Sequence, residues 1–175
     1  MKNIILTVAL LVTCSWGWGQ KEHESKEVHE NKNIVLLFIG STHINQSGIN
    51  MPTFGVEYAH ELFKNAGIGA IVEYEAGQHI IGKEEETGEE IDLTRKNSVL
   101  ILPTLHYAFF NHFLILTAGY GVEIEQEENL GLLKIGLSLE LKLKNPKWYV
   151  VPGVSWDHTK LFDGIVYGFS IGYAF

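Results

Sequence analysis

The last eleven residues, 165–175 (IVYGFSIGYAF), constrain the fold more than any other part of the chain. Large apolar residues alternate here with small ones, and a period of two is the pattern of a β-strand. The large row contains Ile165, Tyr167, Phe169, Ile171, Tyr173 and Phe175, and the small row contains Val166, Gly168, Ser170, Gly172 and Ala174. Such a strand fits a wall that is bulky and apolar on one face and closely packed on the other.

Alternation and turn-forming residues divide the chain from residue 33 onward into eight strands of this kind. The expected strands are 33–43, 54–63, 68–75, 98–109, 113–125, 133–143, 148–157 and 165–175. Strand 33–43 alternates least, so its facing stays open. Short turns are expected after the second, fourth and sixth strands and longer connections after the others. The longest connection, 78–97, is strongly acidic and is expected to be a mobile loop.

This pattern predicts an all-β, eight-stranded, antiparallel up-and-down transmembrane β-barrel, with the bulky rows facing lipid. Closure leaves no unpaired strand edge, which lipid would not tolerate. Eight strands enclose an interior just wide enough for side chains, which argues against an open diffusion pore. Pro103 and Pro152 fall inside expected strands. Because proline cannot donate to a ladder, we expect bulges there or strand ends one or two residues away.

The region from residue 33 onward resembles the small OmpA/OmpX-type barrels of bacterial outer membranes. The resemblance lies in the strand count, the loop asymmetry and the Tyr173-Ala174-Phe175 ending. It implies a location in the bacterial outer membrane and contact with outer-membrane lipid and lipopolysaccharide. It also implies that the barrel-assembly machinery reads Tyr173 and Phe175 as an assembly signal. We expect a monomer.

The other end of the chain predicts export. Lys2 precedes an apolar run at 4–12 and then small residues, so residues 1–19 are expected to be a signal peptide cleaved before Gln20. The only cysteine, Cys14, would leave with it. The alternative is that Cys14 is lipidated, although Thr13 is not the small residue that lipoprotein signals favour. Residues 20–32 are expected to form a polar periplasmic leader, which places the connection 78–97 outside the cell.

The expected inner face is rich in acid. It predicts a luminal charge network of Glu57, Glu61, Glu73, Glu123, Lys134, Glu140, Lys142 and His106, and its further acids are Glu75, Glu125 and Asp157. Charges inside a narrow barrel should pair, because an unpaired buried charge is costly. This network is either a structural ionic plug or a site for a cation or proton. We expect no cofactor and no metal site.

The expected function is a structural or surface-interaction, adhesin-like role without enzymatic activity, with a possible extracellular partner at loop 78–97. The net charge of −8 argues against a nucleic-acid partner. One alternative is a transport-related barrel for small solutes or ions. A second is a lipid A-modifying enzyme that uses Ser41, His43 and Glu57. Ser41 and His43 share a strand face, but their order is the reverse of the His-x-Ser motif of lipid A deacylase barrels.

Overall fold

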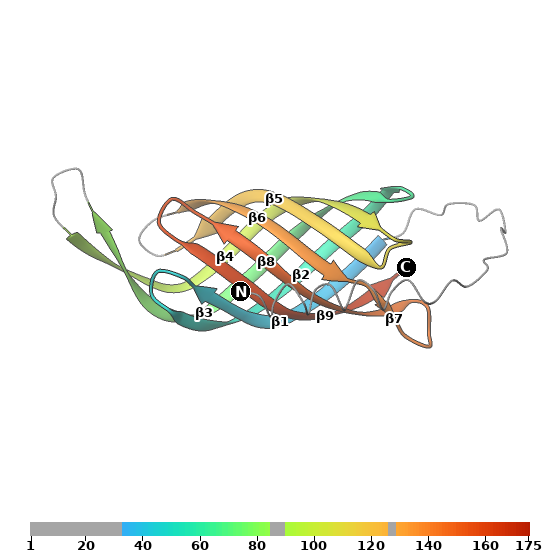
Figure 1. Cartoon of the computed structure of the whole chain (residues 1–175), viewed down its shortest axis with the longest axis horizontal. Coiled ribbons are helices and arrows are strands. Elements are labelled where there is room, and N and C mark those ends of the chain that lie inside the picture. The colour runs from blue at the N-terminus through green and yellow to red at the C-terminus, as the bar shows by residue number, and fades with distance from the viewer. Residues whose placement is uncertain (1–32, 85–89, 126–128) are drawn as a thin grey trace, which may run out of the picture.

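The computed structural model describes residues 33–84, 90–125 and 129–175, and these residues form a tilted antiparallel barrel (Figure 1). The strands are β1 (Asn33–Ile44), β2 (Ile49–Phe63), β3 (Ala66–Glu84), β4 (Glu90–Phe109), β5 (Leu114–Ile124), β6 (Leu130–Leu139), β7 (Leu141–Lys142), β8 (Trp148–His158) and β9 (Asp163–Ala174). The described residues contain no helix that is long and apolar enough to cross a membrane. The expected signal peptide and leader lie outside the described residues and stay predictions.

The barrel closes through two pairings. β1 pairs with β9, which joins the two ends of the described chain, and β6 pairs with β8. The short β7 pairs with β8 in the register that β6 uses, as Ser138↔Gly153 and Leu141↔Val150 show. β6 and β7 are therefore two parts of one wall strand. The predicted eight-stranded antiparallel barrel is confirmed.

The two prolines interrupt ladders without shifting them. The β4–β5 ladder passes from the Ile101 pair to the Thr104 pair in one register, so Pro103 leaves a gap and no bulge. Pro152 lies opposite the point where β6 ends at Leu139 and the wall strand breaks. Both expectations were wrong, because neither proline has a bulge and β4 and β8 each continue for more than two residues on both sides of their proline. A proline removes one donor, and the ladder pairs on either side keep the register.

The outer face of the barrel is a continuous apolar wall. In β9 the large row faces outward as predicted, and Val166 and Ser170 of the small row are buried. In β1, whose facing the sequence left open, Leu37 and Ile39 point outward and Leu36 is buried. Exposed apolar side chains from the other strands include Val56, Tyr58, Val72, Ile101, Leu105, Tyr120, Leu137 and Val154. A surface this apolar is stable only against hydrocarbon.

The expected contrast between short turns and long loops was mostly wrong. The β1–β2 turn at 45–48 and the β8–β9 connection at 159–162 are as short as the β4–β5 turn at 110–113 at the opposite end. The asymmetry lies in β3 and β4, which continue as a hairpin that projects beyond the barrel (Figure 1). We call residues 77–84 and 90–97 the β3–β4 hairpin, and its end of the barrel the hairpin end. The other end, where Asn33 and Phe175 exchange backbone hydrogen bonds, is the terminal end.

The segment 78–97 was expected to be a loop, but the backbone of 78–84 is paired with that of 90–96. The pairs run from Gln78↔Lys96 to Glu84↔Glu90. Its acidic charge suggested a solvated loop, but the strand-favouring residues in it also fit a ladder. At the root of the hairpin the register shifts between Glu75 and Gln78, and Asn97 adopts a φ of 51°. This irregularity is where the hairpin departs from the wall, because a bulge bends its strand.

Two glycines face each other where β1 meets β9. Gly40 and Gly168 are partners in this ladder. A Cβ added at Gly168 would collide with the Ile39 carbonyl oxygen and lie 2.6 Å from the Gly40 Cα and 2.9 Å from the Phe38 ring. The Phe38 ring therefore fills the space that the two missing side chains leave.

Gly168→Ala should destabilise the barrel by roughly 1–3 kcal/mol, because the new methyl group would overpack this contact. Urea unfolding in lipid vesicles, followed by tryptophan fluorescence, measures the change. Gly172→Ala is the matched control on the same strand, since its Cβ would make only ordinary contacts from 3.4 Å. Equal stability of the two variants would show that the Phe38 ring does not require glycine at residue 168.

Candidate functional site

A buried lysine lies at the centre of the lumen. The Lys134 Nζ on β6 lies 3.0 Å from Glu73 Oε2 on β3 and 2.9 Å from Asp157 Oδ2 on β8. It also donates a hydrogen bond of 3.2 Å to the Ser155 hydroxyl. β3 and β6 are separated by two strands in the sheet, so the contact with Glu73 crosses the lumen. We call Glu73, Lys134 and Asp157 the ion-pair cluster. Its three side chains are all buried.

A second polar layer holds the β1–β4 side of the barrel together. Glu75 accepts hydrogen bonds from the Thr42 hydroxyl at 2.7 Å and the Ser98 hydroxyl at 3.1 Å. The Thr42 and Thr53 hydroxyl oxygens lie 2.6 Å apart. All four residues are buried. Sequence reasoning missed Thr42 because the facing of its strand could not be assigned, and hydroxyl groups gave no separate signal.

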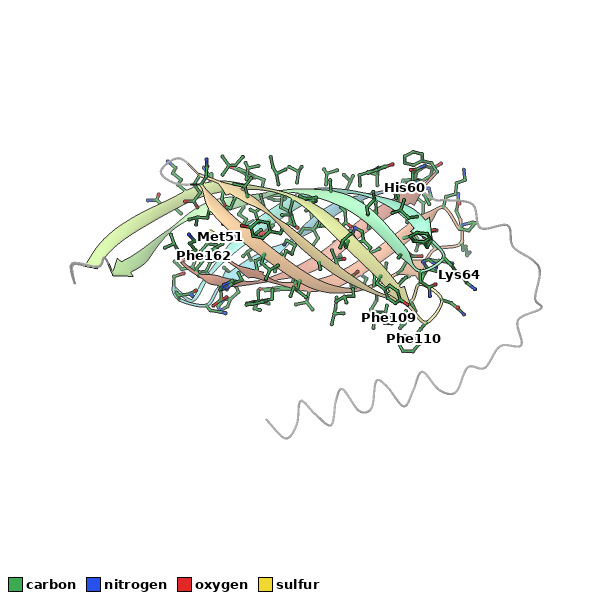
Figure 2. All side chains as sticks on the ribbon, turned by 90° about the horizontal axis from the view of Figure 1, so that it is seen from above. Met51, His60, Lys64, Phe109, Phe110 and Phe162 are labelled. Atoms are coloured by element: carbon green, nitrogen blue, oxygen red, sulfur yellow. The ribbon has the colours of Figure 1, made fainter. Side chains whose placement is uncertain are left out.

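The hairpin end of the lumen is filled by apolar side chains. Ile44, Met51, Leu130 and Phe162 form a buried cluster, which we call the apolar cluster. Figure 2 labels Met51 and Phe162 at the end of the barrel from which the hairpin projects. These residues come from β1, β2, β6 and the 159–162 connection, so they meet across the lumen. The barrel is therefore packed shut on this side of the ion-pair cluster.

The other side of the ion-pair cluster is hollow. A chamber of about 150 Å³ is lined by Lys134 and Glu73 at its inner limit and reaches Asn65 and His112 in the turns at the terminal end. None of the four residues of the apolar cluster lines it. The lumen is thus a blind chamber that extends toward the terminal end. It is not a channel through the described barrel.

A histidine and a glutamate face each other inside the chamber. The His106 Nε2 lies 2.8 Å from the Thr104 hydroxyl, and its Nδ1 lies 3.1 Å from the Thr117 hydroxyl. The same Nε2 lies 3.5 Å from Glu57 Oε1. Nearer the turns, the His112 Nδ1 lies 3.5 Å from Glu61 Oε1. The chamber therefore has two carboxylate–imidazole contacts at two different depths.

The structure brings together most of the predicted charge network. Glu57, Glu61, Glu73, His106, Lys134 and Glu140 all line the chamber. Glu123 is fully buried but does not line the chamber. Lys142 lies in the two-residue β7 and is exposed. Lys142 is the ladder partner of the buried Tyr149, so it keeps the inward row of the wall strand, but it does not line the chamber.

Three residues were considered for an enzyme, and the structure does not assemble them. Ser41 and His43 do share a face, but the face is the outer one, since the neighbouring inner positions Thr42 and Ile44 are buried. Glu57 lines the interior chamber. The β1–β2 register pairs Ser41 with Pro52 and places Glu57 opposite Leu36. The wall of the barrel therefore separates the carboxylate from the other two groups.

The predicted assembly signal lies on the outside at the terminal end. Phe175 is exposed, and its backbone N–H donates a 2.9 Å hydrogen bond to the Asn33 carbonyl. The Tyr173 ring packs edge-on against Trp148, with 5.1 Å between the ring centroids. Both aromatic residues are thus reachable from the surroundings of the barrel. Their recognition by the assembly machinery stays a prediction.

An apolar outer wall around a lumen that buries charged and hydroxyl side chains defines a transmembrane β-barrel of the bacterial outer-membrane type. Among solved structures, the attachment invasion locus protein Ail of Yersinia pestis is similar. Its crystal structure in complex with the heparin analogue sucrose octasulfate has a TM-score of 0.54 and 15% identity, covering 83% of this chain and 99% of Ail. Its backbone structure in a phospholipid bilayer nanodisc has a TM-score of 0.52 and 13% identity, covering 83% and 100%. No protein-family model and no curated protein matches the sequence. The likeness confirms the expected fold.

Lys134→Met should cost roughly 3–5 kcal/mol, because it leaves Glu73 and Asp157 as uncompensated buried charges. The triple variant Lys134→Met, Glu73→Gln, Asp157→Asn should recover much of that loss, since no ionised group then remains in the cluster. Urea unfolding in lipid vesicles measures both effects. Lys160→Met, at an exposed lysine, is the control. A single Lys134 variant as stable as the wild-type chain would contradict this role of the cluster.

Proposed function

We propose that the chain is a non-enzymatic surface-interaction protein that contacts its partner through the β3–β4 hairpin. The observation that carries this proposal is the projection of the hairpin beyond the barrel, with its backbone paired as far as Glu84↔Glu90 (Figure 1). A paired hairpin presents a defined surface, whereas a solvated loop would lose conformational entropy on binding. The barrel is then the membrane anchor that fixes this element at the cell surface.

The hairpin also has unpaired strand edges. The β2–β3 ladder begins at Thr53↔Glu75, and the β4–β5 ladder begins at Val99↔Ile124. Beyond these pairs, β3 and β4 bond only to each other among the described residues. An exposed edge can accept an extended segment of a partner through backbone hydrogen bonds.

The charge of the hairpin region indicates the chemistry of the partner. Residues 78–97 contain the acids Glu84, Glu85, Glu86, Glu89, Glu90 and Asp92 and the bases Lys83, Arg95 and Lys96. This acidic surplus favours a basic or cation-bridged protein surface. Ail is described in complex with a heparin analogue, and a sulfated ligand of that kind would be repelled here. The partner class that we propose for this chain therefore differs from that ligand.

The two alternative functions have less support. A transport role is disfavoured because the apolar cluster fills the hairpin end of the lumen and the ion-pair cluster crosses it. An enzymatic role based on Ser41, His43 and Glu57 is disfavoured because the first two face outward and the third faces inward. Neither argument concerns the hairpin, which is the part of the described chain that is best placed to contact a partner.

Replacing residues 79–95 with Asn-Gly, a favoured two-residue hairpin turn, should leave the barrel folded and abolish partner binding. Fluorescent poly-L-lysine, as a model basic partner, would be titrated onto cells that express each chain, and flow cytometry would measure binding at low and high salt. The binding of the full chain should fall with salt. A gel-mobility difference between boiled and unboiled samples verifies folding.

A second variant keeps the full length of the hairpin and tests its charge alone, by changing Glu84, Glu85, Glu86, Glu89 and Glu90 to Gln. We expect this variant to lose most salt-dependent binding, because the acidic surplus drives the attraction. Undiminished binding by the folded, shortened chain would contradict the proposal that the hairpin is the contact element.

A further inference from the structure

The chamber at the terminal end has the size of a site for a small molecule. Its volume of about 150 Å³ is several times the space that one water occupies in liquid, roughly 30 Å³. It is smaller than the pockets of roughly 300–1,000 Å³ that hold drug-sized ligands. The chamber ends at the ion-pair cluster and extends to Asn65 and His112 in the terminal-end turns. A ligand would therefore be a compact molecule that enters and leaves by the same end.

Most of the chamber wall is apolar. Its apolar lining residues include Leu36, Ala59, Ile71, Tyr149 and Val151. Leu36, Tyr149 and Val151 belong to one buried cluster, so this part of the wall is well packed and fixed in shape. A preformed apolar cavity with a few polar groups is the usual form of a small-molecule site. The wall favours a ligand with an apolar body.

One carboxylate inside the chamber has little local compensation. Glu57 lines the chamber, and 23% of its side chain is accessible. Lys134, the nearby cation, is already 3.0 Å from Glu73 and 2.9 Å from Asp157. The contact described for Glu57 is the His106 ring at 3.5 Å, and that ring also lies within hydrogen-bonding distance of Thr104 and Thr117. An ionised carboxylate has capacity for several donors, so a cationic group in the chamber would stabilise it.

Acidic side chains also line the part of the chamber through which a ligand would reach Glu57. Glu61 and Glu140 line the chamber as well, and Glu61 lies beside His112 at the turns. Carboxylates along an entry of low dielectric raise the local concentration of cations and exclude anions. The lining thus combines an apolar wall with acidic groups at both depths.

We propose that this chamber binds a small organic cation, a protonated amine with a compact apolar body, whose ammonium group pairs with Glu57. The ligand enters from the terminal end, which the expected topology places in the periplasm. This site is separate from the surface role of the hairpin. The ion-pair cluster and the apolar cluster close the far side of the chamber, so its ligand enters and leaves at the terminal end without crossing the membrane.

The test uses the full chain in zwitterionic nanodiscs with labelled isoleucine methyl groups. n-Butylammonium is titrated, with 1-butanol as the neutral control and butyrate as the anionic control. Ile71 is buried against the chamber, and Ile39 faces lipid. We expect n-butylammonium to shift the Ile71 methyl signal saturably and leave Ile39 unchanged. The neutral and anionic molecules should bind at least tenfold more weakly.

Two variants and a control locate the site. Glu57→Gln keeps the shape of the side chain and should weaken n-butylammonium binding by tenfold or more. Ala59→Leu should abolish it by filling the chamber while the carboxylate remains. Asp163→Asn removes a carboxylate that lies outside the chamber, beside His158, and should change nothing.

The proposal fails if Ile71 does not respond, or if 1-butanol binds as tightly as n-butylammonium. It also fails if folded Glu57→Gln binds n-butylammonium like the wild-type chain. Should Glu57→Gln not fold, Ala59→Leu and the three-ligand comparison on the wild-type chain decide the question.

Discussion

Lipid offers the backbone no hydrogen-bond partner, and this constraint determines most of the structure. Every wall strand must find a neighbour on both sides, which is why β1 returns to β9 and why β8 pairs with both β6 and β7. The same constraint limits how the chain can place proline. Pro103 leaves a gap in one ladder while its other neighbour continues to pair, and the register is unchanged on either side. Closure thus tolerates a missing donor at Pro103 without any change of register in this ladder.

Closure at eight strands then determines what the interior can hold. The lumen is narrow enough for one lysine to reach carboxylates on β3 and β8 at once. This contact divides it into a packed half, filled by the apolar cluster, and a hollow half that extends to the terminal end. The two halves serve different purposes in our account. The packed half closes the barrel beneath the projecting hairpin, and the hollow half supplies a small-molecule site.

The sequence was sufficient where one physical requirement acts on every second residue. The rows of β9 and the inward acids Glu57, Glu73 and Glu75 follow from lipid on one side and a crowded lumen on the other. The sequence was insufficient where two physical requirements compete. The acidic charge of 78–97 suggested a loop although the backbone continues as strands, and the facing of β1 stayed open because its residues are large on both faces. Lys142 follows the alternation but lies beyond the break in the wall strand.

The contacts of the candidate site were harder to predict than its residues. Alternation placed Lys134 and Glu73 inside, but their meeting across the lumen depends on the curvature of the closed sheet. The separation of Ser41 from Glu57 depends on the facing of one strand and the β1–β2 register. Periodicity along one strand carries no information on either point. Only pairing between strands fixes which side chains meet.

Disulfide trapping between β1 and β9 tests closure, on which the account rests, most directly. Leu37 and Ile171 are ladder partners, and both are exposed on the outer wall. With Cys14 changed to Ser, the pair Leu37→Cys and Ile171→Cys should cross-link on mild oxidation in isolated membranes. The pair Leu37→Cys and Phe169→Cys, offset by one step on the same face, should cross-link far less. Absence of the first cross-link, or equal yields from both pairs, would contradict a closed barrel in this register.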